Sequence, residues 1–285
     1  MIVGDCKAAL PWVAVLALAG CVEKVEPVRL DTAGVKPKLA YADLAAVLDR
    51  GVDGNGHLDM FFLKKLAARL DAQLKLLAVT GPTATPGLLP APDERLAYWY
   101  NARAAWATKL AMLANCPKEL SRERFEARPF PLDGRQMTLE DIDAILSKDD
   151  DWRVVVAAPC ARLHRARMPK APFWAADVRG RAARRFEQYI DEEARFVIDV
   201  QERRILVPAV LWQFRGRLID EHNRTYGTAG ATLITALLPY VGGSPARRLQ
   251  NAIGYRPVLD SPGGPMACQK HYEEPDDQQV QAERG

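Results

Sequence analysis

The chain has 285 residues, of which 48% are hydrophobic and 26% are charged, and its formal net charge is +3 at pH 7. These values are ordinary for a globular protein, and the length allows one or two domains with a buried core. The net charge is too small to indicate a nucleic-acid partner, and none is expected.

The N-terminus has the pattern of a bacterial secretion signal followed by a lipidation site. Lys7 precedes an apolar run over residues 8–20. This run is shorter than the roughly 20 residues that a membrane span needs, but it has the length of the apolar part of a signal peptide. It ends in Leu-Ala-Gly-Cys at residues 18–21, which resembles the lipobox of bacterial lipoproteins.

We therefore expect residues 1–20 to be a signal peptide and Cys21 to carry lipid as the first residue of the mature chain. The lipid on Cys21 is then the contact with a membrane, and several acyl chains on this residue give stable attachment. The expected location is the bacterial cell envelope, either periplasmic or at the outer membrane. The alternative is a buried N-terminal helix that contains a cysteine.

Most of the remaining chain has helical periodicity. Apolar residues recur at helical spacing in four segments, and two further helical stretches follow: 40–51, 60–79, 94–114, 180–196, 229–240 and 245–253. Strand signals are fewer. Residues 129–137 indicate a strand–turn–strand around Asp133 and Gly134, residues 154–158 a buried strand, and residues 204–207 an edge strand.

These patterns predict an α+β fold, with a single, predominantly helical domain and a small β-sheet. We place the domain at residues 39–265. Residues 21–38 are polar and contain two prolines, so they are expected to be a tether between lipid and domain. Residues 266–285 are expected to be a disordered polar tail.

The cysteines limit the disulfides and give no metal site. Cys116, Cys160 and Cys268 remain beyond the signal and Cys21, so at most one disulfide forms among them and the pairing stays open. Their spacing is not that of a zinc site. Residues 53–59 look like part of a calcium loop, but two strong oxygen ligands are missing, and a turn is the better interpretation. No metal and no cofactor are expected.

The helix predicted over residues 94–114 carries a first set of candidate binding residues. Trp99 and Arg103 lie near one face of this helix, and Asn101 sits in mid-helix, where its side chain needs a partner. Either this is a core helix in which Asn101 bonds to a neighbouring loop, or Trp99, Asn101 and Arg103 form part of a ligand-binding face.

The same segment carries a family resemblance. Residues 96–106, Leu-Ala-Tyr-Trp-Tyr-Asn-Ala-Arg-Ala-Ala-Trp, resemble the signature helix of the domain of unknown function 547 family. Residues 139–146 and 154–160 resemble a later helix and an apolar strand that ends in cysteine, and the likeness extends over about residues 40–260. Arg103-Ala104 stands where the family pattern has Tyr-Asn, and Asp143-Ala144 where it has Glu-His. The resemblance implies a divergent member and no particular reaction.

Cys160 and His164 are the candidate catalytic residues. Cys160 follows an apolar run, and basic residues near it are expected to lower the pKa of its thiol. With His164 as its base, it would act in a Cys160-dependent hydrolase or acyltransferase. The alternative is a buried, inert thiol.

A basic stretch between residues 162 and 185 is the last candidate. Its arginines suit phosphate, anionic polysaccharide or lipid headgroups, and the alternative is a solvated helix face balanced by acidic residues. Our leading prediction is a non-catalytic or catalytically degraded envelope protein that binds an anionic or peptide-like ligand. The residues expected to hold it are Trp99, Asn101, Arg103, Arg162, Arg165 and Arg167.

Overall fold

The computed structural model of the protein describes residues 25–192, 195–260 and 264–269. The expected signal peptide and Cys21 lie outside this part of the chain. About 47% of the chain is helical and the sheets are small, which confirms the predicted single-domain α+β class. Among the described residues, no helix combines the length and the apolar character needed to cross a bilayer.

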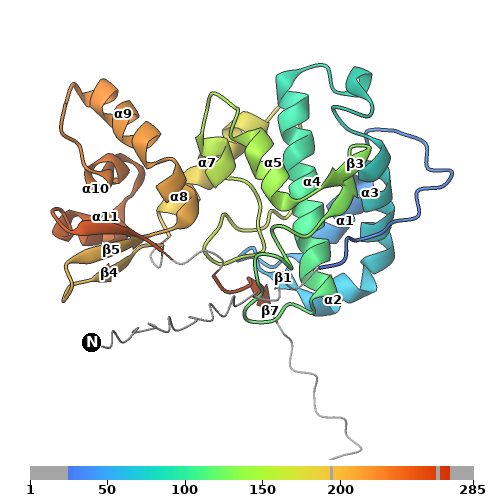
Figure 1. The fold of residues 1–285 in the computed structure, drawn as a ribbon, viewed down its shortest axis with the longest axis horizontal. Helices are drawn as coiled ribbons and strands as arrows, with labels where there is room; N and C mark the ends of the chain where they lie inside the picture. Colours follow the sequence, from blue (N-terminus) through green and yellow to red (C-terminus); the bar gives the residue numbers. More distant parts are fainter. Residues whose placement is uncertain (1–24, 193–194, 261–263, 270–285) are drawn as a thin grey trace, which may run out of the picture.

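One half of the molecule is built around the long helix α4 (Pro92–Leu113). Nearly every side chain from Leu96 to Thr108 is buried, because other helices pack on several sides of α4 and its many alanines let them approach closely. Figure 1 shows these neighbours around it. They are α2 (Met60–Lys65), α3 (Ala67–Val79), α5 (Leu139–Leu146) and α7 (Val178–Ile190), and α1 (Ala42–Gly51) packs in turn on α2 and α3.

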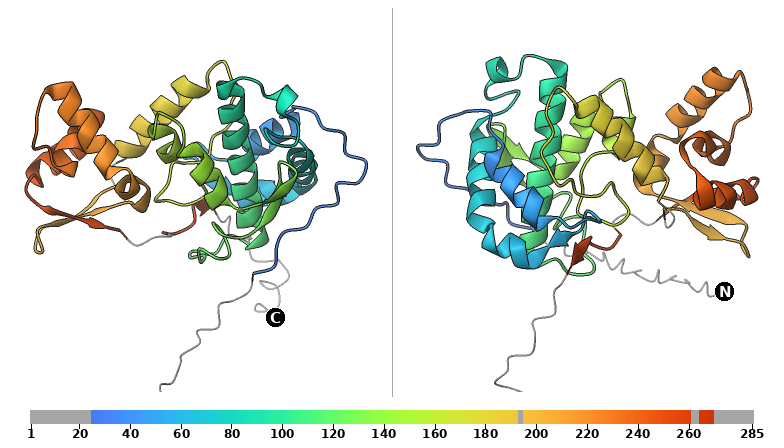
Figure 2. Two further views of the ribbon diagram at one scale, coloured as in Figure 1. Left: turned by 45° about the horizontal axis from the view of Figure 1, so that its top comes forward. Right: turned by 180° about the vertical axis from the view of Figure 1, so that it is seen from behind.

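The other half follows α7 and contains a three-stranded sheet with helices above it (Figure 1, Figure 2). The sheet order is β4 (Val197–Asp199), β5 (Arg204–Val207) and β6 (Arg256–Leu259). β5 pairs antiparallel with β4 and parallel with β6. The strand predicted at residues 204–207 is therefore correct, but it is central and not an edge strand. The helices are α8 (Ala209–Gln213), α9 (Arg215–Tyr226), α10 (Leu233–Leu237) and α11 (Gly243–Asn251), with a 3-10 turn, η2 (Leu238–Tyr240).

The structure contains the hairpin and the following helix that local sequence signals predict. β2 (Phe130–Leu132) and β3 (Arg135–Met137) are joined by Asp133 and Gly134, both with positive φ, as a two-residue hairpin turn requires. At the start of α5, the Thr138 Oγ1 accepts from the Asp141 N–H at 3.0 Å, and the Asp141 carboxylate accepts from the Thr138 N–H at 2.8 Å. The strand–turn–strand prediction is confirmed.

Two predicted elements differ in the structure. The strand predicted at residues 154–158 is instead a short helix, α6 (Arg153–Val156), whose three valines are buried. A fully buried apolar run has no periodicity that separates strand from helix. The helix predicted over residues 60–79 divides at Leu66, and its first part is capped by Asp59, whose carboxylate accepts from the Phe61 and Phe62 N–H groups.

The folded part of the chain extends beyond both ends of the domain predicted at residues 39–265. Val28 is buried and its N–H donates to the Pro129 carbonyl at 2.8 Å, so part of the expected tether packs on the domain. At the other end, β7 (Cys268–Gln269) pairs parallel with β1 (Leu58–Asp59), and Cys268 forms a disulfide with Cys116. The first residues of the expected tail therefore belong to the fold, and residues 270–285 lie outside the described part.

Candidate functional site

A cavity of about 450 Å³ lies where three segments of the chain meet. They are the turn of residues 53–56, the loop of residues 167–170 and the C-terminal part of α7 with the residues after it. Seven charged residues line the cavity: Arg167, Lys170, Arg185 and Arg195 are basic, and Asp53, Asp191 and Glu192 are acidic. This concentration of charge makes the cavity the candidate binding site.

The first wall is a tight turn fixed by its own sequence. The Asp53 Oδ1 accepts from the N–H groups of Asn55 and His57, both at 2.8 Å, and Gly56 has a φ of 74°. A Cβ at Gly56 would lie 2.6 Å from the Cβ of Arg167, so only glycine allows the turn to approach the second wall this closely. The interpretation of these residues as a turn and not a calcium loop agrees with this geometry.

The second wall is held against the first by hydrogen bonds. The Arg167 Nη1 donates to the Asn55 carbonyl at 2.8 Å, and the Met168 N–H donates to the Gly56 carbonyl at 3.2 Å. Lys170 is exposed two residues further along the loop. The loop is therefore positioned by backbone contacts while the Lys170 ammonium stays at the cavity.

The third wall is amphipathic helix α7. Its apolar residues recur at helical spacing and pack inward, and this turns Arg185 and Gln188 toward the cavity. The Arg185 side chain is half-buried. Its Nε donates to the Ala157 carbonyl at 2.9 Å and its Nη2 to the Arg167 carbonyl at 2.5 Å. The guanidinium is thus oriented by two neutral acceptors.

Two of the cavity arginines share one carboxylate. The Glu192 carboxylate accepts from Arg167 at 2.8 Å and from Arg195 on its other oxygen. Burial alone would raise the pKa of Glu192, but the hydrogen bond from Arg167 and the charge of Arg195 lower it below its ordinary value. These three residues form an ion-paired cluster that shapes the wall.

Arg185 and Lys170 are not compensated in this way. Within residues 25–192, 195–260 and 264–269, no carboxylate lies within 4.0 Å of either cation. Burial lowers the pKa of Arg185 to about 10, so the group is still cationic at neutral pH. A partly desolvated cation that is hydrogen-bonded to carbonyls and has no carboxylate partner favours an incoming anion.

The acidic residues of the cavity supply acceptors beside these cations. The Asp191 Oδ1 accepts from the Gly242 N–H at 2.8 Å, and the Asp53 Oδ2 accepts from the Gln269 Nε2 at 2.5 Å. The remaining acceptor capacity of these carboxylates suits a hydroxyl or amine on the same ligand. The part of the chain that the structure describes contains no cluster of three or more His, Cys, Asp or Glu that could hold a metal ion.

The residues predicted as a binding face on α4 lie in the core, so that prediction is wrong. Asn101 is fully buried, where its Nδ2 donates to the Phe173 carbonyl at 2.9 Å and its Oδ1 accepts from the Phe173 N–H at 2.8 Å. Trp99 is 6% exposed and packs against Tyr98. Arg103 is 1% exposed and bonds both oxygens of Asp143, at 2.7 and 3.0 Å. The alternative of a core helix with a satisfied Asn describes this segment.

Cys160 and His164 are not brought together as a nucleophile and its base. Cys160 is 1% exposed, its N–H donates to the Ala166 carbonyl, and its thiol lies beside the Arg103 guanidinium. The His164 Nδ1 lies 3.5 Å from an Asp260 carboxylate oxygen. In the described residues, no hydrogen bond joins the thiol to a histidine, so the geometry favours the buried thiol over the enzyme.

The predicted basic residues separate in the structure. Arg162 is buried and donates to the Leu120 carbonyl at 2.8 Å and to Glu126. Arg165 donates to Asp143 at 2.9 Å, and only Arg167 reaches the cavity. Arg162 and Arg165 are therefore structural. Lys170 and Arg185 belong to the same basic stretch, but no sequence signal distinguishes them from arginines that are paired in the fold.

No protein-family model matches the chain, and searches of curated proteins and of solved structures give no match either. The resemblance to the domain of unknown function 547 family stays a prediction.

Proposed function

We propose that the protein is a lipid-anchored binding protein of a bacterial cell envelope, and that the cavity beside α7 holds a small anionic ligand. The observation that carries the binding proposal is the Arg185 guanidinium, which lines the cavity with two carbonyl partners and no carboxylate within salt-bridge distance in the described residues. Binding is favoured over catalysis because the free thiol of Cys160 is buried away from any histidine partner in that part of the chain.

The chemistry of the cavity limits the ligand. A guanidinium forms paired, charge-assisted hydrogen bonds with a carboxylate or phosphate, and the Lys170 ammonium adds a second positive charge. Asp53 and Asp191 line the same cavity and would accept from a hydroxyl or amine. A ligand with an anionic group at one end and donors at the other, such as a short peptide, fits this arrangement.

The binding proposal is tested by replacing Arg185 with methionine. Inorganic phosphate and the dipeptide alanyl-glutamate are titrated into the full chain by calorimetry. We expect Arg185→Met to weaken binding about tenfold or more, since one charge-assisted hydrogen bond contributes about 1.5–3 kcal/mol. Arg184→Met is the control, because Arg184 is exposed on the same helix and does not line the cavity. Equal affinity in wild type and Arg185→Met, or no binding of either probe to wild type, contradicts the proposal.

The anchor is tested separately. It rests on the Leu-Ala-Gly-Cys run at residues 18–21. Replacing Cys21 by serine removes the thiol that would carry the lipid, so the protein should move from the membrane fraction to the soluble envelope fraction. Unchanged fractionation of Cys21→Ser contradicts lipid anchoring.

A further inference from the structure

Large apolar side chains are exposed at one end of the molecule. α2 turns Met60 and Leu63 inward, which leaves Phe61 50% and Phe62 39% exposed. α2 packs beside α4, whose last residue, Leu113, is 47% exposed. Scattered exposed apolar residues are ordinary, but here they lie on neighbouring elements at the same end of α4.

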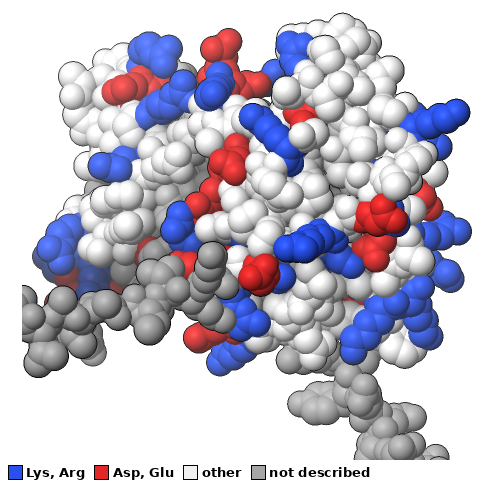
Figure 3. Space-filling view, turned by 45° about the vertical axis from the view of Figure 1, so that its right-hand side comes forward, with Lys and Arg blue, Asp and Glu red and all other residues white. Residues whose placement is uncertain are grey.

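Basic side chains lie beside these exposed apolar side chains. We define the α4-end surface by its exposed apolar and basic residues: Phe61, Phe62, Lys64, Lys65, Leu113, Lys118 and Arg124. The loop after α4 belongs to this end. Its Lys118 carbonyl accepts from the Met266 N–H, just before β7. β7 in turn pairs with β1, which directly precedes α2. Among the described residues, these four cations outnumber the exposed carboxylates of Glu119 and Glu123. Figure 3 shows Lys and Arg side chains along the lower right edge of the molecule.

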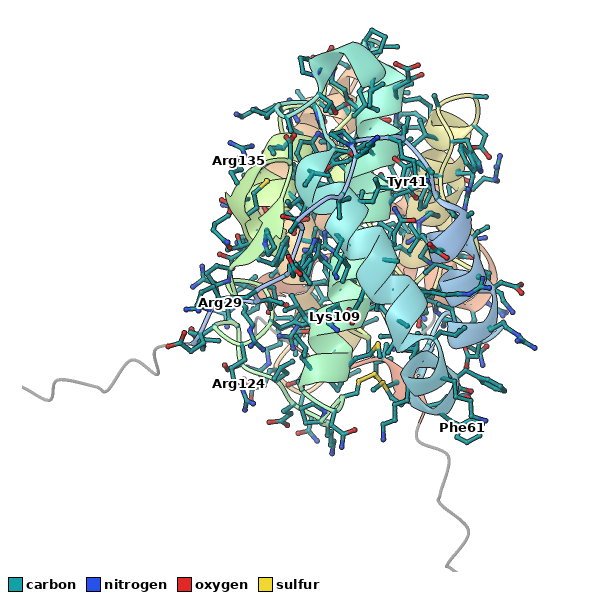
Figure 4. The ribbon with its side chains drawn as sticks, turned by 90° about the vertical axis from the view of Figure 1, so that its right-hand side faces the viewer. Arg29, Tyr41, Phe61, Lys109, Arg124 and Arg135 are labelled. Atoms are coloured by element: carbon teal, nitrogen blue, oxygen red, sulfur yellow. A yellow bond between two sulfur atoms is a disulfide. The ribbon has the colours of Figure 1, made fainter. Side chains whose placement is uncertain are left out.

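The described chain also begins at this end. The Glu26 carbonyl accepts from the Arg128 Nε at 3.2 Å, which places the start of the chain against the loop that follows α4. Figure 4 shows Arg29 and Arg124 near each other, with Phe61 at the lower end of the same view. Three residues separate Cys21 from Val25, and the four residue steps reach at most about 14 Å. A lipid on Cys21 would hold this end of the molecule next to the bilayer.

We infer that the α4-end surface lies on an anionic lipid bilayer. Phe62 and Leu113 enter the boundary between headgroups and acyl chains, and Lys64, Lys65, Lys118 and Arg124 contact anionic headgroups. Aromatic and aliphatic side chains flanked by lysines are the composition of a surface that lies in the membrane interface. Basic residues near an anionic membrane surface are attracted to it. This inference rests on the lipid anchor proposed above, and it fixes which way the anchored domain faces.

The experiment measures the depth of single positions in a bilayer. The full chain carrying Phe62→Cys or Leu113→Cys is labelled with an environment-sensitive fluorophore and reconstituted in vesicles of phosphatidylethanolamine and phosphatidylglycerol with brominated phospholipid. Leu88→Cys is the matched control. Leu88 is a 42% exposed leucine in η1 (Pro86–Leu88), before the start of α4, and α4 spans about 33 Å.

We expect bromine to quench the probes at positions 62 and 113 several-fold more strongly than the probe at position 88. Adding Lys64→Glu and Lys65→Glu should abolish that difference. Equal quenching at all three positions overturns the inference. A signal at positions 62 and 113 that depends on protein concentration and not on brominated lipid also overturns it, because a second copy of the chain then covers the surface.

Failure of the anchor and failure of the surface give different results. If Cys21→Ser releases the protein from membranes while positions 62 and 113 of the wild-type chain show no preferential quenching, the anchor stands and the surface is wrong. If Cys21→Ser fractionates like wild type while these positions are quenched, the surface stands and the anchor is wrong.

Discussion

Arg103 on α4 is buried and Arg185 on α7 is half-buried, and their charged surroundings differ. Arg103 meets both oxygens of Asp143, and Arg165 bonds to the same carboxylate. Burial alone would lower the pKa of Arg103, yet the charge of Asp143 raises it above its ordinary value. Arg185 has two carbonyl partners and no carboxylate within 4.0 Å in the described chain, and burial lowers its pKa to about 10.

The difference shows that a carboxylate partner supplied by the fold marks a structural arginine, and that its absence marks a candidate binding arginine. Arg103 joins helices α4 and α5 through a carboxylate that the fold supplies. Around Arg185 the fold supplies a cavity instead. An anionic ligand in this cavity would pair with the charge of Arg185, as Asp143 pairs with the charge of Arg103.

The largest expected effect comes from Arg103→Met. This change leaves Asp143 with Arg165 as its only bonded cation among the described residues, and breaking a buried ion pair from one side costs about 3 kcal/mol or more. We expect the free energy of unfolding in urea to fall by that amount. Arg122→Met is the control, because Arg122 and Glu140 form an exposed pair and little change is expected. A loss of under about 1 kcal/mol in Arg103→Met would show that the cluster is not structural.

Acid should destabilise the protein through the same cluster. Burial would raise the pKa of Asp143, but Arg103 and Arg165 lower it below its ordinary value. A depressed native pKa contributes stability that is fully present above the unfolded pKa of about 4 and is lost as the pH falls through the native pKa. The melting temperature should therefore fall below about pH 4, and less steeply in Arg103→Met. Glu192 has a depressed pKa in both proteins, so the difference between the two curves reports Asp143. Identical slopes would contradict this assignment.

Signals within a few residues predicted local structure well. The Asp133-Gly134 hairpin turn and the Thr138–Asp141 cap were readable because their hydrogen bonds join near neighbours in the sequence. The structure of residues 154–158 could not be predicted in this way, since a buried run of β-branched residues suits a strand and a core helix alike. The Cys116–Cys268 disulfide joins residues 152 positions apart, and the spacing left its pairing open.

The residues of the candidate site could not be predicted in the same way, because ion pairs between residues far apart in the sequence decide which cations are left for a ligand. Arg103 meets Asp143 from 40 positions away, and Arg162 meets Glu126 from 36. The basic stretch was recognised from the sequence, but which of its cations lacks a carboxylate is decided by these distant partners. The turn at residues 53–56 was recognised as a turn, and its place as a wall of the cavity follows only from the contacts of Gly56 with Arg167 and Met168.

The smallest expected effect is the change in the free energy of unfolding caused by Arg185→Met. It is also the sharpest test of the comparison between Arg103 and Arg185. The change removes two hydrogen bonds to carbonyls, but it also removes a partly desolvated charge that no carboxylate of the described residues balances, so the free energy of unfolding should stay within about 1 kcal/mol of wild type. An anion that binds the cavity should stabilise wild type by about 1.4 kcal/mol at ten times its dissociation constant, and at the same concentration it should stabilise Arg185→Met by no more than about 0.4 kcal/mol. Urea unfolding with and without phosphate measures both effects, with Arg184→Met as the control. A loss as large as that of Arg103→Met, with no response of wild type to the anion, would make Arg185 a structural residue like Arg103.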